Sequence, residues 1–369
     1  MKIYEALHDR LLDRREAAVK LLIGALKQRV SFHSLRDNLK KNEFPTGIGW
    51  DDIHAHSMDG TEVGEKFRNF LVETYSQSLV AGNRYVWLYD LDRELTSALV
   101  TRLTETKVNG SYFESSYPLP LPVEGLVKAP GDPELCEIRH HKSGDVSLVF
   151  CQARFYDDKT SYAAKELPEH VRKTYHDVDR VVTYRKIFYQ AYDVITIRAN
   201  LNRLEVCVDD PAKLTSTDLE TQPLKLLTAA ALHLEMLTGT GGRPPLNLFG
   251  AIAAMYYEGR EGTVTSLSFR TITGSIKKER MTAASQDLRD EKFHHAGVNA
   301  LGQKISPYEL TLEYETKIPL GAAQLKLSAM IKELAAENPT LHGCFVSSLS
   351  FECFTNALNR MVTFIPDEK

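Results

Sequence analysis

The sequence predicts an α+β protein with an N-terminal helical hairpin, a central and largely antiparallel β-sheet, and a C-terminal α+β region. Two observations carry this prediction. Apolar residues recur at helical spacing near the N-terminus, and paired apolar runs in the middle of the chain flank short turn sequences. The chain of 369 residues is longer than a typical domain with a single hydrophobic core. We therefore expect a helical region over 1–80, an antiparallel β-rich domain over 81–212 and an α+β domain over 213–369.

The N-terminal region reads as helices separated by one loop. Leucines and valines recur between charges and predict an amphipathic helix over 4–30, followed by a helix over 32–41 that starts near Ser31 or Ser34. Residues 1–42 carry ten Lys or Arg against five Asp or Glu, so this hairpin is basic. Proline and glycine predict a loop over 43–64 before a helix over 65–80.

Two hairpins dominate the middle of the chain. A strand over 84–92 opens the β-rich stretch, and five prolines make 110–133 an irregular connection. Residues 135–141 and 146–156 flank a Lys-Ser-Gly-Asp turn, and residues 180–198 and 203–209 flank the turn at 199–202. A short helix is expected at about 166–176. These strands predict an antiparallel sheet spanning about 84–209.

The C-terminal third mixes both kinds of element. Its apolar patterning predicts helices over 222–237, 246–258 and 321–336, and strands over 263–273, 308–318 and 343–352.

Composition narrows the functional classes. A net charge of −4 and a pI near 6.3 argue against a surface that coats nucleic acid as a whole, but they leave a local basic patch open. Five scattered cysteines with no Cys-x-x-Cys pair predict free thiols in a reducing compartment. The first ten residues are charged where a signal peptide is apolar. We therefore expect a cytoplasmic protein with no membrane partner and no cofactor.

The segment 170–209 carries the main functional prediction, because basic residues and tyrosines alternate there. Guanidinium and ammonium groups suit phosphates, and flat rings suit bases. The candidates for phosphate contact are Arg172, Lys173, Arg180, Arg185, Lys186 and Arg198, and those for stacking are Tyr184, Tyr189 and Tyr192. The sequence thus predicts a non-catalytic subunit that binds DNA, RNA, another protein subunit or a second copy of itself. Period two divides these residues over both faces of the strand, so an ordinary structural role for the tyrosines stays open.

A second reading is a metal-dependent hydrolase or nuclease. The string Asp51-Asp52-Ile53-His54-Ala55-His56 resembles the first metal-binding motif of the amidohydrolase and polymerase-histidinol-phosphatase superfamilies. That resemblance implies His54 and His56 as ligands on an extended backbone, with Asp52 or Asp59 beside them. The alternative is a polar loop in which Asp59 or Thr61 caps the next helix.

Two further readings remain. Glu313 to Lys317 ends in a Glu-x-Lys pattern that resembles the metal-binding strand of restriction-type nucleases. The chain also fits a scaffold subunit that pairs through its N-terminal helices or through the apolar helices of 222–258. Since strong enzyme motifs are lacking, we hypothesise a role in a multi-gene system, such as defence against phage.

Overall fold

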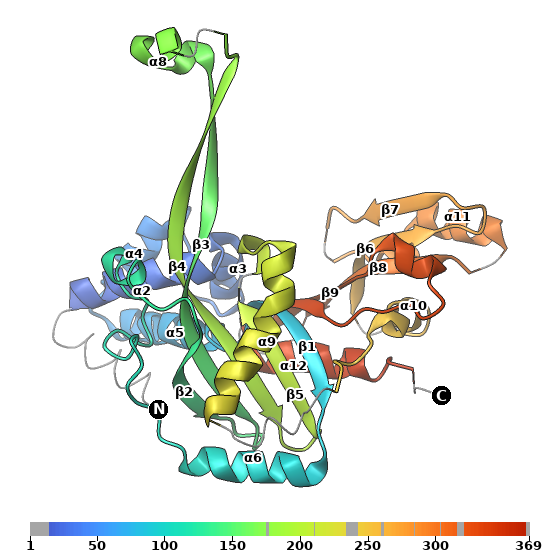
Figure 1. Cartoon of the computed structure of the whole chain (residues 1–369), viewed down its shortest axis with the longest axis horizontal. Coiled ribbons are helices and arrows are strands. Elements are labelled where there is room, and N and C mark those ends of the chain that lie inside the picture. Colours follow the sequence, from blue (N-terminus) through green and yellow to red (C-terminus); the bar gives the residue numbers. More distant parts are fainter. Residues whose placement is uncertain are drawn as a thin grey trace.

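The computed structural model describes residues 15–366 except 175–176, 210, 234–242, 260–261, 284, 303 and 316–320. The described residues form an α+β architecture, as predicted, around one ten-stranded sheet in which every strand pair is antiparallel (Figure 1). The strand order is β2-β3-β4-β5-β1-β10-β9-β8-β6-β7. Pairing of β1 with β10 joins the strands of the middle of the chain to those of its C-terminal third.

The strands lie where alternating or apolar runs predicted most of them. Their bounds are β1 Gly82–Asp90, β2 Glu134–His140, β3 Val146–Ala163, β4 Arg180–Arg198, β5 Arg203–Asp209, β6 Thr263–Arg270, β7 Ile276–Arg280, β8 Ser306–Glu315, β9 Ala322–Ser328 and β10 Cys344–Ser348. Both predicted hairpins, β2 with β3 and β4 with β5, are confirmed.

Apart from α8, the longer helices lie around the body of this sheet (Figure 1). The helices are α2 Arg15–Arg29, α3 Phe32–Lys41, α4 Trp50–Ser57, α5 Glu62–Ser78, α6 Arg93–Glu105, α7 Val123–Leu126, α8 Glu169–Thr174, α9 Ser216–His233, α10 Phe249–Tyr257, α11 Lys292–Leu301 and α12 Phe351–Val362, with short 3₁₀ turns η1 Ala164–Glu166, η2 Pro211–Lys213, η4 Leu288–Asp290 and η5 Ile331–Ala335. The Ser31 side chain caps α3 by accepting from Ser34 N at 3.1 Å, as predicted.

Two apolar clusters cover opposite faces of the β2–β5 half of the sheet. Helices α6 and α9 bury one face over Leu148, Ile195 and Val206. Helices α2 to α5 cover the other face, and their cluster continues under α10 and α12 into the strands of the C-terminal third (Figure 1). Core and sheet therefore run across the residues where we placed domain boundaries, and those boundaries stay a prediction.

Several elements differ from the expectation. Residues 321–336 form β9 and the turn η5 instead of a helix, and the reason is visible in the strict alternation of buried Ala323, Leu325 and Leu327 with more exposed neighbours. Helices α6 and α12 were not predicted. The loop expected over 43–64 contains α4, because Ile53 and Ser57 are buried one helical turn apart.

A buried ionic network joins the helices to the strands of the middle of the chain. Both oxygens of Asp209, at the end of β5, accept from Arg29 of α2 at 2.9 and 3.1 Å, and Arg84 of β1 lies 3.3 Å away. Tyr192 N donates to Asp209 at 2.8 Å, and Asp209 N donates to Asp193 of β4 at 2.8 Å. Burial alone would raise the pKa of Asp209, but the two guanidinium groups outweigh it and hold that pKa well below its usual range.

We expect Asp209→Asn to destabilise the fold by about 3–5 kcal/mol, because it leaves two buried guanidinium groups without a full counter-charge. Denaturant unfolding of both proteins measures the difference. Exposed Asp132→Asn is the matched control and should change the free energy of unfolding by no more than about 0.5 kcal/mol. Equal effects of the two substitutions would contradict a structural role for the network.

His141 closes the β2–β3 hairpin from a partly buried position. Its ring stacks on Phe351 of α12 with centroids 4.0 Å apart, and its Nε2 lies 2.8 Å from Ser147 Oγ. Burial, reinforced by the nearby positive charge of Arg139, lowers the pKa of His141 to about 4.

This pKa predicts a pH-dependent stability. Between about pH 6.5 and pH 4 the unfolded chain binds a proton at His141 that the folded chain does not, so stability falls as the pH falls through that window. The contribution is about 2 kcal/mol between pH 7 and pH 5. Urea unfolding measures the free energy of unfolding of the wild type and of His141→Asn at both pH values. The fall in this free energy from pH 7 to pH 5 should be about 2 kcal/mol smaller in His141→Asn than in the wild type. An unchanged pH dependence would contradict the assignment.

Candidate functional site

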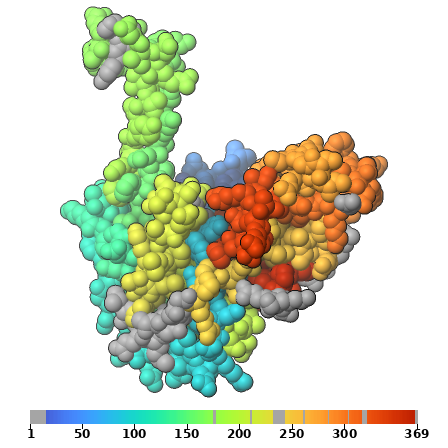
Figure 2. Space-filling model, turned by 45° about the vertical axis from the view of Figure 1, so that its right-hand side comes forward, coloured from blue at the N-terminus to red at the C-terminus, as the bar shows by residue number. Residues whose placement is uncertain are grey.

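β3 and β4 continue together beyond their neighbours in the sheet. β2 pairs with β3 only as far as Cys151, and β5 pairs with β4 only from Val194 onward. The two long strands therefore leave the body as a two-stranded ribbon that carries α8 at its tip (Figures 1 and 2). We call residues 155–188 the arm.

Beyond its root at Tyr156, Ile187 and Phe188, solvent surrounds the arm on both faces. None of its described residues is buried. The paired part runs from Phe155 opposite Phe188 to Ala163 opposite Arg180, which corresponds to about 30 Å at about 3.3 Å per residue. A two-stranded ribbon without a supporting layer is marginally stable in water. The arm is thus the described part of the fold that would gain most from a binding partner.

Apolar side chains are exposed along this ribbon. Tyr184 is 66% exposed and Phe155 is 48% exposed, and both lie on one face with Val182. The ring of Phe155 contacts Phe188, with centroids 5.6 Å apart, and the ammonium of Lys186 lies 4.4 Å from the Phe155 ring centroid. This face therefore combines flat rings with a cation.

The arm's charges largely balance. Residues 155–188 contain seven Lys or Arg and six Asp or Glu. The strand register sets Lys186 opposite Asp157 and Arg185 opposite Asp158. At the tip, Lys173 pairs with Glu169 at 2.9 Å. Opposite charges that face each other across a ribbon stabilise it and weaken its field at a distance.

The nine residues predicted to contact nucleic acid fall into two groups. Six lie exposed on the arm: Arg172, Lys173, Arg180, Tyr184, Arg185 and Lys186. Tyr189, Tyr192 and Arg198 lie on the same strand but inside the body, where they are buried. Their side chains have almost no surface to offer a ligand as large as a nucleic acid.

Internal contacts account for these three buried side chains. The Lys213 ammonium lies 4.5 Å from the ring centroid of Tyr189. The Tyr192 hydroxyl donates to Pro118 O at 3.1 Å, and Arg198 lies 3.3 Å from Asp145. They act as structural residues at the root of the arm and at the β4–β5 turn.

Phe155 and Tyr162 lie on the arm but were not predicted as site residues, and Tyr162 also lies beyond residue 156, where the predicted strand ended. β3 extends to Ala163, and its residues 155–163 pair with residues 180–188 of β4. A signal was available, since a strand of 19 residues needs a partner of comparable length.

The metal site inferred from His54 and His56 is not formed. Both residues lie on α4, and side chains two positions apart on a helix point in different directions. Asp52 instead accepts from Ile48 N at 2.8 Å and fixes the start of this helix. A side chain at Gly47 would collide with Asp52, which explains the glycine there.

The other features of this segment are structural. Thr61 caps α5 by accepting from Gly64 N at 3.3 Å, and Asp59 accepts from Thr61 N at 2.9 Å, as the alternative reading predicted. Glu313 accepts from Gln324, and Glu315, the acid of the Glu-x-Lys pattern, pairs with Lys41 at 3.7 Å. Lys317 lies outside the described residues. Across the described ranges, no three His, Cys, Asp or Glu side chains converge on a possible metal position.

Comparison with known proteins adds no functional information. No protein-family model matches the sequence, and no curated protein shows significant similarity to it. Of the helices in the described part of the chain, none combines the length and apolar character needed to cross a membrane.

Proposed function

We propose that this protein is a non-catalytic subunit that binds another protein through its arm. The observation that supports the proposal most is the ribbon of residues 155–188, which leaves the body with both faces uncovered and with aromatic rings exposed. Exposed rings of this kind anchor protein interfaces when a partner desolvates them.

The backbone of the arm supports the same proposal. Beyond Phe155 on β3 and Phe188 on β4, neither strand pairs with a third described strand. Each outer edge therefore offers backbone N–H and C=O groups to a strand of a partner, which is the mode of β-strand addition.

The charges of the arm favour protein over nucleic acid. Affinity for a phosphate backbone grows with the number of cations that a surface presents without nearby carboxylates. On the arm, Asp157 and Asp158 lie opposite the two adjacent cations of β4, Lys186 and Arg185. A partner surface of mixed charge with an apolar groove fits this pattern better than a polyanion does.

A shortened protein tests this proposal. Joining Tyr156 to Ile187 through an Asn-Gly turn removes residues 157–186 while keeping the paired strands below. We expect the shortened chain to fold and to lose a defined, stoichiometric protein partner that the full-length chain retains in its own cells. Affinity purification followed by quantitative mass spectrometry makes the comparison.

Single substitutions then locate the interface. With the purified partner, Tyr184→Ala should weaken binding about tenfold or more, as removal of an interface tyrosine commonly does. Exposed Thr160→Ala is the control on the same ribbon and should change the affinity less than about threefold. Retention of the same partner by the shortened chain would contradict the proposal.

Nucleic acid is a second candidate, because a two-stranded ribbon fits the major groove and five of the predicted cations are exposed on the arm. On this reading, Arg185→Ala with Lys186→Ala should reduce the affinity for a labelled DNA or RNA, and binding should weaken steeply between low and physiological salt. Fluorescence anisotropy measures both. No detectable binding at low salt would remove this candidate. Pairing of copies through the N-terminal or 222–258 helices stays a prediction.

A further inference from the structure

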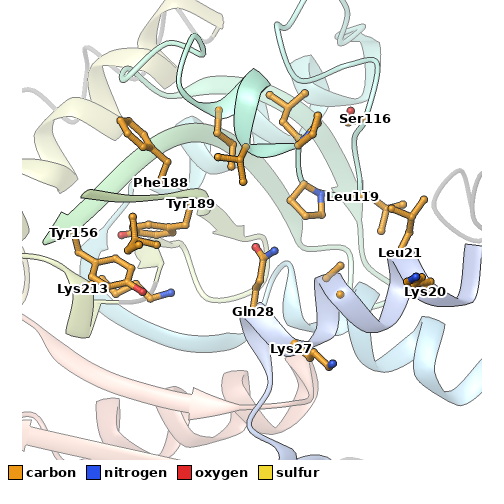
Figure 3. Close-up of a pocket in the computed structure, with 18 residues that line it drawn as sticks. Lys20, Leu21, Lys27, Gln28, Ser116, Leu119, Tyr156, Phe188, Tyr189 and Lys213 are labelled. Atoms are coloured by element: carbon orange, nitrogen blue, oxygen red, sulfur yellow. The ribbon is translucent and has the colours of Figure 1, made fainter. Parts of the chain in front are cut away.

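A cavity of about 760 Å³ lies where the arm joins the body (Figure 3). Helix α2 forms one wall, the loop from Ser116 to Val123 forms a second, and the root of the arm forms the third. In Figure 3, Gln28 of α2 lies between Tyr189 of the arm root and Leu119 of the loop. The volume falls in the range of small-molecule sites, about 300–1,000 Å³.

The lining carries charge of one sign. Lys20 of α2 and Lys213 of η2 contribute ammonium groups, and no Asp or Glu lines the cavity. Lys27 of α2 also belongs to the lining, with its ammonium 5.9 Å from the ring centroid of Trp50. In a chain with 49 acidic and 45 basic residues, such a site is locally distinct from the rest of the surface. A concave surface with one sign of charge concentrates ligands of the opposite sign.

Aliphatic side chains form a large part of the apolar lining. Leu21, Leu119, Leu121 and Ile187 contribute side chains to its walls. Three aromatic rings also lie there. The Lys213 ammonium lies 5.6 Å from the ring centroid of Tyr156 and 4.5 Å from that of Tyr189, and the ring of Phe188 packs against Phe155 with centroids 5.6 Å apart. Because each of these rings already has a cation or another ring beside it, the cavity favours an aliphatic ligand over a stacked base.

We propose that this cavity binds an amphipathic anion, a molecule with one phosphate or carboxylate group and an aliphatic body. The head group lies near Lys20 and Lys27 at the α2 wall, and the body lies against Leu119, Leu121 and Ile187. This site is separate from the protein-binding role of the arm and does not depend on it.

Binding of octyl phosphate to the full-length protein tests the site by isothermal titration calorimetry, with octanol and AMP as comparison ligands. We expect octyl phosphate to bind, and to bind at least about tenfold more tightly than octanol or AMP. The double substitution Lys20→Gln with Lys27→Gln should lower the affinity for octyl phosphate about tenfold and leave the affinity for octanol unchanged. Exposed Lys40→Gln, on α3 outside the cavity, should change neither.

A second variant blocks the cavity without disturbing the fold. Gly24 lies on the α2 wall, and a side chain started there meets no other atom within 4 Å. Gly24→Phe should abolish octyl phosphate binding, whereas Gly297→Phe, at an equally open glycine of α11, should preserve it. The proposal is overturned if octyl phosphate does not bind, if Gly24→Phe leaves its binding intact, or if AMP binds more tightly. Circular dichroism confirms that both variants fold.

Discussion

The ion pair between Arg29 and Asp209 is the interaction on which the arrangement of this protein depends. It fastens the first described helix to the end of β5, and Arg84 connects the same carboxylate to β1. Arg29 and Arg84 also donate to the carbonyls of Ser78 and Leu79 at the end of α5, at 2.6 and 2.7 Å. The Asp209 carboxylate thereby connects α2 and α5 with β1 and β5. The N–H groups of Arg29 and Arg84 have hydrogen-bond acceptors, which buried charged groups require.

This network also defines where the arm begins. Arg154 of β3 binds Asp193 of β4 and Gln222 of α9, and its Nη1 donates to Asp209 O at 3.1 Å. One residue further along β3, at Phe155, the ribbon becomes exposed. Within one residue, β3 and β4 thus change from a buried root held by hydrogen bonds and ion pairs to an exposed ribbon. A rigid root gives the exposed half a defined direction, which reduces the conformational entropy lost when a partner binds.

Much of the fold was predictable because period and turn chemistry are local properties. The two central hairpins, the Ser31 cap and most helices follow from residues close together in sequence. The failures share another cause. The composition of residues 321–336 predicts a helix, but the first part of this segment forms the strand β9. His54 and His56 could act as metal ligands together on an extended backbone, but they lie on the helix α4. In both cases burial against distant elements decides the structure, so tertiary context overrides local preference.

The candidate site illustrates the same division more sharply. Residues of β4 from Arg180 to Arg198 alternate in one continuous pattern, yet Tyr184 is exposed and Tyr192 is buried. The difference arises from strands elsewhere in the chain, because β2 and β5 end before the ribbon does. The length of a neighbouring strand, and not the composition of β4, determines which tyrosines can meet a partner. The binding surface inferred from composition alone therefore included both exposed residues of the arm and buried residues of the body.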